Sequence, residues 1–77
     1  MLKDNPLRKE LAGLVKAIAN ENGLEQENQV LIMHLLNTEE KIYQFSEWVQ
    51  SGIVDGKLLA TETEICRAAV QASKKQD

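Results

Sequence analysis

The chain has few of the residues that cross-link or stiffen small domains. Its 77 residues include one cysteine, Cys66, one proline and three aromatic residues. One cysteine cannot form an internal disulfide, and a lone thiol suits a reducing compartment better than a secreted framework. We therefore expect a cytoplasmic protein whose fold depends on packing alone.

Long apolar runs are also absent. No segment approaches the roughly 18 consecutive apolar residues that a membrane-spanning helix needs. Near the N-terminus, Lys3, Arg8, Lys9, Glu10 and Lys16 interrupt the apolar positions, so this segment lacks the unbroken core of a signal peptide. The sequence predicts a soluble chain without membrane association.

Side chains for catalysis or metal binding are equally scarce. The single histidine, His34, and the single cysteine, Cys66, fall in different predicted helices. A zinc site takes three or four cysteine, histidine or carboxylate ligands. Di-iron bundles carry a glutamate three residues before a histidine, where this chain has Leu31. We expect no catalytic activity, no metal and no cofactor.

The charges are unevenly distributed although the net charge is only −3. Residues 1–20 carry four bases and two acids, whereas residues 21–47 carry six acids and one base. An acidic segment could face a basic partner, but acids near helix N-termini are also favoured by the helix dipole. We prefer the second interpretation, and the overall acidity makes nucleic acid an unlikely ligand.

Two helices are predicted in the N-terminal half. Asn5 and Pro6 form a helix start, since asparagine caps free N–H groups and proline tolerates the first helical position. The helix should fade over 20–22, with Gly23 as a left-handed cap. The apolar stripe of this helix is Leu7, Leu11, Leu14, Val15 and Ile18. A second helix should run from Leu24 or Glu25 to Leu36, with a strand as the alternative for its apolar part.

A third helix should start at Asn37. Asparagine is a good N-cap, and Glu40 stands three residues later, as in a capping box. Ser51 and Gly52 should end the helix, and Ile53 is placed to pack back on its last turn. Its inward stripe should be Ile42, Phe45 and Val49, with Trp48 beside it.

The start of the fourth helix is ambiguous. Asp55 and Gly56 indicate a turn, and apolar residues keep helical register from there on. Thr61 and Glu64 form a capping box that would instead start the helix at Thr61. Its buried face should comprise Ile65, Ala68, Ala69 and Ala72. The tail from about residue 73 should be frayed.

These elements predict an all-α fold. Residues 1–77 should form a single domain, a small bundle of four short helices that are mostly antiparallel. Six of the seven residues in 30–36 are apolar, and a helix that is apolar nearly all round must be covered on several sides. We therefore expect the second helix to be central and a second copy of the chain, in a homodimer, to help cover it.

The candidate site is a protein interface. It comprises Val30, Ile32, Met33, His34, Leu36, Tyr43 and Trp48. Tyrosine and tryptophan are enriched at interface hot spots, although Trp48 could equally cap the core. In a symmetric dimer built on the second helix, His34 could meet its own copy, and association would then weaken as the pH falls through its titration.

The sequence thus favours a small, non-catalytic interaction or regulatory protein that binds itself or another protein. The alternative is a DNA-binding accessory protein or transcriptional regulator that uses the C-terminal helices. Against it, Glu62 and Glu64 stand at the start of the helix that would read DNA, where phosphates would repel them.

Overall fold

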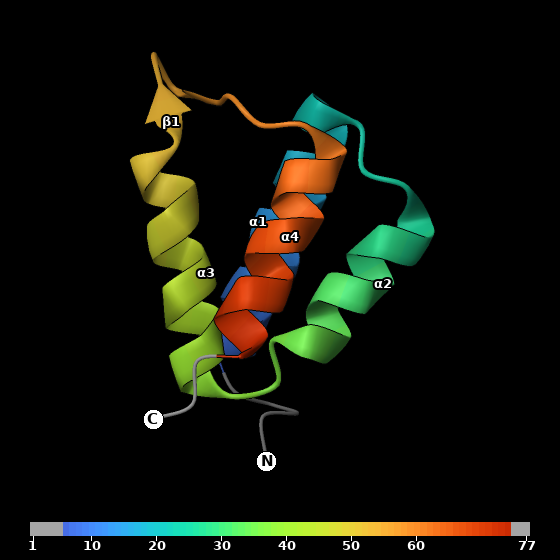
Figure 1. The fold of residues 1–77 in the computed structure, drawn as a ribbon, viewed down its shortest axis with the longest axis vertical. Helices are drawn as coiled ribbons and strands as arrows, with labels where there is room; N and C mark the ends of the chain where they lie inside the picture. The colour runs from blue at the N-terminus through green and yellow to red at the C-terminus, as the bar shows by residue number, and fades with distance from the viewer. Residues whose placement is uncertain (1–5, 75–77) are drawn as a thin grey trace.

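Four helices account for most of the chain, which confirms the predicted all-α class. The computed structural model describes residues 6–74. Its elements are α1 (Pro6–Asn22), α2 (Gln26–Leu35), α3 (Glu39–Ser51), β1 (Ile53–Val54), β2 (Lys57–Leu58) and α4 (Glu62–Ser73). The helices lie side by side, and the short hairpin closes one end of the molecule (Figure 1).

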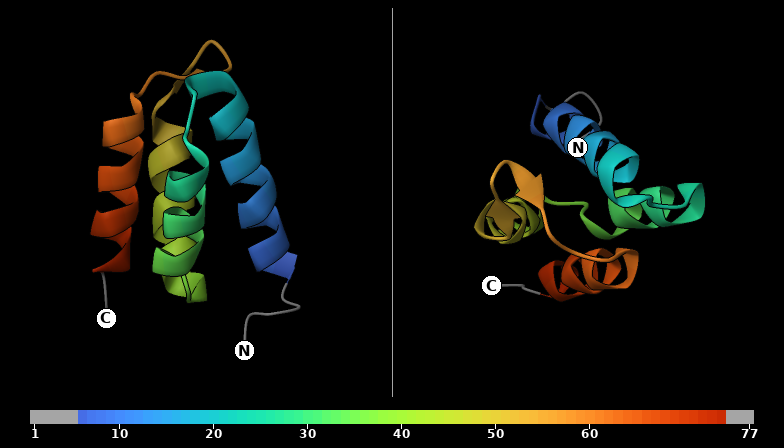
Figure 2. Two further views of the ribbon diagram at one scale, coloured as in Figure 1. Left: turned by 90° about the vertical axis from the view of Figure 1, so that its right-hand side faces the viewer. Right: turned by 90° about the horizontal axis from the view of Figure 1, so that it is seen from above.

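The helices stand at the four corners of a square when seen end-on (Figure 2). α1 and α4 each pack against both α2 and α3, so α2 and α3 lie diagonally opposite one another. The chain neighbours α1/α2 and α3/α4 run in opposite directions, whereas α1/α3 and α2/α4 run in the same direction (Figure 2). The expected antiparallel packing therefore describes chain neighbours and not every packed pair.

The core between the helices is entirely apolar. Its buried side chains are Leu11, Val15, Ile18, Leu24, Ile32, Leu36, Ile42, Phe45, Val49, Leu58, Ile65, Ala69 and Ala72. No polar or charged side chain is buried within residues 6–74. All three predicted stripes on α1, α3 and α4 supply this core, although Leu7, Leu14 and Ala68 are only partly buried. Helical periodicity therefore located most of the core.

The first helix ends as predicted. Gly23 has φ +77°, a left-handed conformation that glycine adopts without steric cost, and its N–H donates to the carbonyl oxygen of Ala19 at 3.0 Å. Leu24 then enters the core before α2 begins at Gln26. The predicted cap at the other end, Asn5, lies outside the described residues.

The expectation of a central second helix is wrong. α2 occupies one corner, and within it only Ile32 is fully buried, joined by Leu36 at its C-terminal end. Val30 and Leu31 are 52% and 42% exposed. An apolar run shows how much apolar surface a helix carries, but neighbouring elements decide which sides of the helix are covered. Within residues 6–74, the elements that pack most closely on α2 are α1 and α4.

The cap predicted for the third helix is shifted by one residue. Thr38, not Asn37, is the N-cap: its Oγ1 accepts from the N–H of Lys41 at 3.3 Å. The Oδ1 of Asn37 instead accepts from Nζ of Lys41 at 3.2 Å. Both residue types cap helices well, so the sequence alone could not separate them.

A β-hairpin between α3 and α4 was not predicted. β1 and β2 pair antiparallel, with Ile53 opposite Leu58. Between them Asp55 and Gly56 both have positive φ, 54° and 79°, as a two-residue type I′ turn requires. Ile53 does not pack back on α3, because hairpin pairing leaves it 41% exposed, and Leu58 fills that position.

The fourth helix begins at the later of the two predicted starts. Thr61 Oγ1 accepts from the N–H of Glu64 at 3.2 Å, and Glu64 Oε1 accepts from the N–H of Thr61 at 2.9 Å, which completes the capping box. The hairpin turn occupies the earlier start. α4 ends at Ser73, and residues 75–77 of the expected frayed tail lie outside the described residues.

Candidate interaction surfaces

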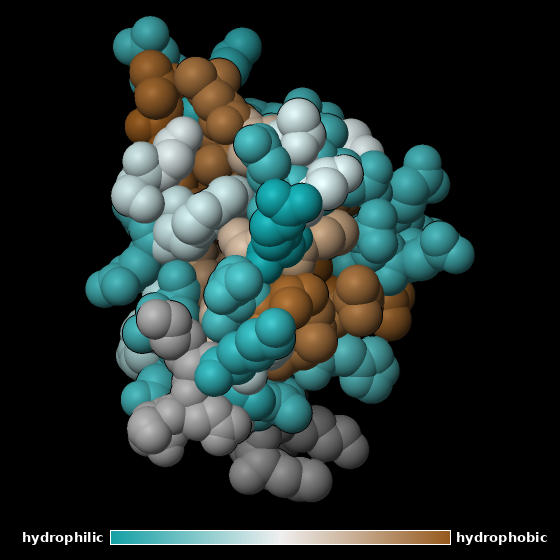
Figure 3. Space-filling model, in the orientation of Figure 1, coloured by the Kyte–Doolittle hydropathy of each residue, from teal (hydrophilic) through white to brown (hydrophobic). Residues whose placement is uncertain are grey.

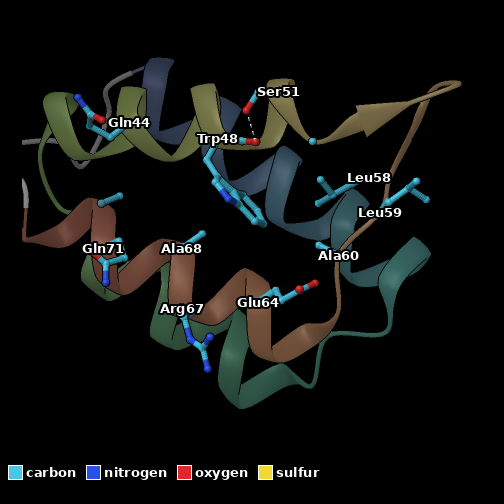
Figure 4. Close-up of a pocket in the computed structure, with 12 residues that line it drawn as sticks. Gln44, Trp48, Ser51, Leu58, Leu59, Ala60, Glu64, Arg67, Ala68 and Gln71 are labelled. Carbon is cyan, nitrogen blue, oxygen red and sulfur yellow. Dashed lines mark hydrogen bonds between the residues drawn. The ribbon is translucent and has the colours of Figure 1, made fainter.

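One surface feature is a groove between α3, the hairpin and α4. We call it the hairpin groove; its volume is about 600 Å³. Its apolar lining is formed by Trp48, Leu58, Leu59, Ala60, Ala68 and Ala72. Figure 4 shows the indole of Trp48 projecting from α3 toward α4, while Leu59 stands at the open end. Leu59 is 68% exposed, which is unusual for a leucine in a preformed apolar groove.

Close packing beneath the groove holds the indole in place. The Trp48 ring stacks on the buried Phe45 ring, with centroids 6.0 Å apart and planes 25° apart. Gly52 lets the hairpin approach α3 closely, because a Cβ there would lie 2.9 Å from Cδ1 of Leu58. Asn22 of α1 fixes the other side: its Nδ2 donates to the carbonyl oxygens of Leu58 and Ala60, both at 2.9 Å. The groove is therefore a rigid part of the fold.

The charged residues around the hairpin groove are few. Glu64 is occupied by its capping box, and Arg67 points away from the indole (Figure 4). The remaining polar lining consists of amides and a hydroxyl from Gln44, Ser51 and Gln71. Such a rim suits an apolar side chain of a partner, surrounded by uncharged hydrogen-bonding groups.

Exposed apolar side chains gather in two places on one face of the molecule. Figure 3 shows one apolar area over the hairpin and another over the lower part of α2 and the adjoining part of α4. In the hairpin, Ile53 and Val54 are at least 41% exposed, and in α2, Val30 and Leu31 are at least 42% exposed; Val30 also lines a groove between α1 and α2. Both areas lie outside the core and are available to a partner.

A second groove lies between α1 and α2 and differs in charge from the rest of the molecule. We call it the basic groove; its volume is about 440 Å³. Arg8, Lys16 and His34 line it, together with apolar side chains that include Val30 and Met33, and no acid is among its lining residues. In a chain of net charge −3, this is a locally positive surface.

Arg8 is held at one end of the basic groove by the C-terminal end of α2. Its Nη1 donates to the carbonyl oxygen of Leu36 at 3.2 Å, and its Nη2 donates to that of Met33 at 3.1 Å. These carbonyls lack partners within α2, and a cation near them is also favoured by the helix dipole. Arg8 is thus a structural link between α1 and α2.

Glu62 links α4 to the opposite end of α2. Its Oε2 accepts from the backbone N–H of Glu25 at 2.7 Å and from Nδ2 of Asn28 at 2.6 Å. These two hydrogen bonds, the backbone one first, lower the pKa of the Glu62 carboxyl below its ordinary value. The carboxylate therefore takes the place of a side-chain cap, which Glu25 does not provide for α2.

The candidate reactive pair is not assembled. Burial and, to a smaller extent, the nearby charge of Glu62 raise the pKa of the Cys66 thiol, so the thiol stays protonated and is a poor nucleophile. His34 is exposed and lines the basic groove between α1 and α2, whereas Cys66 is on α4. No hydrogen bond joins the two residues within 6–74. The geometry offers no thiolate–imidazole chemistry.

The predicted interface residues separate into three groups. Ile32 and Leu36 are fully buried by this chain itself, so they are core residues and not interface residues. The other members divide between the basic groove and the helix α3. Val30, Met33 and His34 line the basic groove, Trp48 lines the hairpin groove, and Tyr43 is exposed on the outer side of α3.

Sequence reasoning missed the hairpin groove apart from Trp48. In the sequence, Leu58 and Leu59 fit a fourth helix that starts near Asp55. No signal in the sequence places either residue near Trp48. Their approach depends on the hairpin and on Asn22, which is 36 residues before Leu58. Contacts of this sequence separation cannot be derived from local patterns.

The described residues contain neither a metal-binding cluster nor a membrane-spanning helix. Within 6–74, no three His, Cys, Asp or Glu side chains lie close enough together to hold a metal ion. None of the four helices is both long and apolar enough to cross a membrane. No protein-family model, curated protein or solved structure matches the chain. The hairpin groove and the basic groove are therefore the features of the molecule that bear on its function.

Proposed function

We propose that this chain is a small, non-catalytic interaction or regulatory module of the cytoplasm, which binds another protein or further copies of itself. The observation that carries the proposal is the hairpin groove, an apolar surface space that is lined by the Trp48 indole and has the exposed side chain of Leu59 at its edge. Apolar pockets containing tryptophan are where interface binding energy concentrates.

The scarcity of charge in the hairpin groove supports a protein ligand with an apolar anchor. Leu59 would bury its 68% exposed side chain on binding, and complete burial of a leucine contributes about 1.5–3 kcal/mol. Gln44 and Gln71 would supply hydrogen bonds at the rim. An amphipathic helix, which presents one apolar face, has the required chemistry.

A defined peptide library tests this proposal. Amphipathic helical peptides displayed on phage would be selected on the wild-type protein, and their affinity for the Leu59→Ser variant would then be measured. We expect affinity to fall about tenfold, since 1.4 kcal/mol corresponds to a factor of ten. Because Trp48 is the only tryptophan, its emission should shift to shorter wavelength when a peptide covers it.

Val54→Ser is the matched control for this experiment. Val54 is a 52% exposed apolar residue of the same hairpin, but it does not line the hairpin groove. Peptide affinity should be unchanged in this variant. Selected peptides that bind Leu59→Ser as tightly as wild type, with no change in Trp48 emission, would contradict the proposal.

The DNA-binding alternative receives less support. A recognition helix contacts bases through its N-terminal residues, and in α4 these include Glu62 and Glu64. The Glu62 carboxylate is also engaged by α2, so this end of α4 is not free. We expect no salt-sensitive shift of duplex DNA in a gel, because the start of α4 that would meet the phosphates carries two carboxylates.

A further inference from the structure

The basic groove has a regular arrangement of charge and apolar surface. Arg8 and Lys16 are eight residues apart on α1, which corresponds to about 12 Å along the helix axis. Between them lie Ala12 on α1 and, on the facing wall, Val30 and Met33. The groove thus presents a cation at each end and apolar surface in the middle.

Of the two cations, Lys16 is fully available to a ligand, as is the neighbouring His34 side chain. Lys16 and His34 are exposed, and neither makes a hydrogen bond or ion pair with another described residue. Arg8 has two of its five N–H groups committed to carbonyl oxygens of α2, which fixes the guanidinium in position. The ligand that complements this arrangement has two carboxylates flanking an apolar or aromatic group.

The outer side of α3 carries this pattern. Glu40, Tyr43 and Glu47 follow one another at spacings of three and four residues, so they form one stripe along the helix. All three side chains are exposed. Tyr43, at 59% exposure, is the exposed large hydrophobic residue of α3. The two carboxylates are about 10 Å apart along the axis, close to the separation of the two cations. We call this stripe the α3 ridge.

We propose that the basic groove of one copy of this chain receives the α3 ridge of a second copy. The carboxylates of Glu40 and Glu47 meet the cations at the two ends of the groove, and the Tyr43 ring covers the apolar middle. The charge complementarity and the matched spacing identify the occupant as a second copy. This inference specifies the self-association included in the proposed function, and it uses a surface separate from the hairpin groove.

The contact is heterologous. α3 stands diagonally opposite α2 (Figure 2), so the α3 ridge and the basic groove lie on different sides of the molecule. After two copies have docked, one copy still has a free ridge and the other still has a free groove. Successive copies therefore add head to tail, and the assembly grows with concentration unless a ring closes. This differs from the symmetric homodimer expected from the sequence.

Two charge reversals give a specific test by sedimentation velocity. Lys16→Glu disables the groove and leaves the ridge intact, whereas Glu47→Lys disables the ridge and leaves the groove intact. Each variant alone should associate at least about tenfold more weakly than wild type, as expected for loss of one attractive pair and gain of a repulsive one. An equal mixture should associate more strongly than either variant alone, because the intact ridge of Lys16→Glu fits the intact groove of Glu47→Lys.

Lys9→Glu is the matched control for Lys16→Glu. Lys9 is exposed on the same helix but does not line the basic groove, so its reversal changes the net charge equally and should leave association unchanged. Circular dichroism of each variant establishes that it is folded. The inference is overturned by a wild-type protein that stays monomeric at millimolar concentration, by equal effects of Lys9→Glu and Lys16→Glu, or by a mixture that does not pair.

The hairpin-groove experiment separates this result from the proposed function. Lys16 and Glu47 do not line that groove, so selected peptides should bind their variants as they bind wild type. If the wild-type protein binds the peptides but does not self-associate, docking of the α3 ridge in the basic groove is overturned and the hairpin groove is not. Loss of Leu59-dependent peptide binding with self-association intact overturns the hairpin groove alone.

Discussion

One carboxylate, that of Glu62, stabilises the beginnings of two helices. It lies in the first turn of α4, where a negative charge is favoured by the helix dipole, and it accepts two hydrogen bonds from the first turn of α2. The sequence indicated the first role and could not indicate the second, because Glu25 is 37 residues away. Pairing across this distance depends on how the helices pack.

Replacing Glu62 by glutamine should change how stability depends on pH. The pKa of Glu62 is lower in the folded protein than in the unfolded chain, so its stabilisation is present above the ordinary glutamate pKa. It is lost as the pH falls through the lowered folded-state value. Urea denaturation at several pH values should show wild type more stable than Glu62→Gln at neutral pH, with the difference vanishing in acid.

Glu27→Gln is the control for Glu62→Gln. A change at Glu64 cannot serve, because it would disturb the capping box. Glu27 is an exposed acid in the first turn of α2 and has no hydrogen bond to another helix. Its replacement should leave the acid transition of the wild type nearly unchanged. A pH-independent effect of Glu62→Gln would contradict the assigned cause of the lowered pKa.

At the scale of elements, sequence patterns located the helices better than the segments between them. Helical periodicity extends over ten or more residues in each helix, and the Thr61–Glu64 box was one of two predicted starts of α4, the one that the structure adopts. The strands of the hairpin have two residues each, too few to show the alternation that marks a strand. The turn at Asp55 and Gly56 was visible in the sequence, but its pairing was not.

Arg8 provides a test of how α1 and α2 are joined. Arg8→Ala removes two hydrogen bonds to the last turn of α2 and should lower the free energy of unfolding by about 1–2 kcal/mol. Arg8→Lys should lose less, since it keeps the charge near the helix C-terminus but not the planar fork. Urea denaturation measures the loss, and hydrogen exchange should show it first at the C-terminal end of α2.

Lys9→Ala is the neighbouring control for the Arg8 variants. Lys9 is an exposed cation on the same turn of α1 with no hydrogen bond to α2, so its removal should change stability by less than about 0.5 kcal/mol. Equal losses for Arg8→Ala and Lys9→Ala would show that the link between α1 and α2 does not depend on the guanidinium.

At the scale of the whole molecule, the sequence indicated the amount of apolar surface but not its distribution. The run from Val30 to Leu36 suggested that one copy could not cover itself. In the fold, Ile32 and Leu36 are covered by the same chain, while Val30 and Leu31 remain exposed. The two grooves likewise arise where separate helices meet, which is why single candidates such as Trp48 and His34 were recognised without their surroundings.

The small size of the core makes the fold sensitive to loss of its largest member. At about 0.05–0.15 kcal/mol per residue, 77 residues give a total stability of about 4–12 kcal/mol. Phe45 is fully buried and stacks on Trp48, and its replacement by alanine should cost about 3–5 kcal/mol. Far-UV circular dichroism and urea denaturation of Phe45→Ala should show a largely unfolded or marginally stable chain.

Tyr43→Ala is the control for Phe45→Ala, because it removes an aromatic ring from the surface of the same helix and not from the core. Tyr43 is on the same helix and 59% exposed, so this variant should unfold at nearly the wild-type urea concentration. Similar midpoints for Phe45→Ala and Tyr43→Ala would mean that the stacked pair is not the centre of the core. Tyr43→Ala should nevertheless weaken docking of the α3 ridge.

The position of Glu62 late in the chain has a consequence for biosynthesis. A ribosome produces the N-terminal residues first, so α1 and α2 emerge before the carboxylate that completes the start of α2 has been made. The start of α2 therefore acquires this cap only after residue 62 has been synthesised, and a product that ends before residue 62 lacks the acceptor for Glu25 and Asn28.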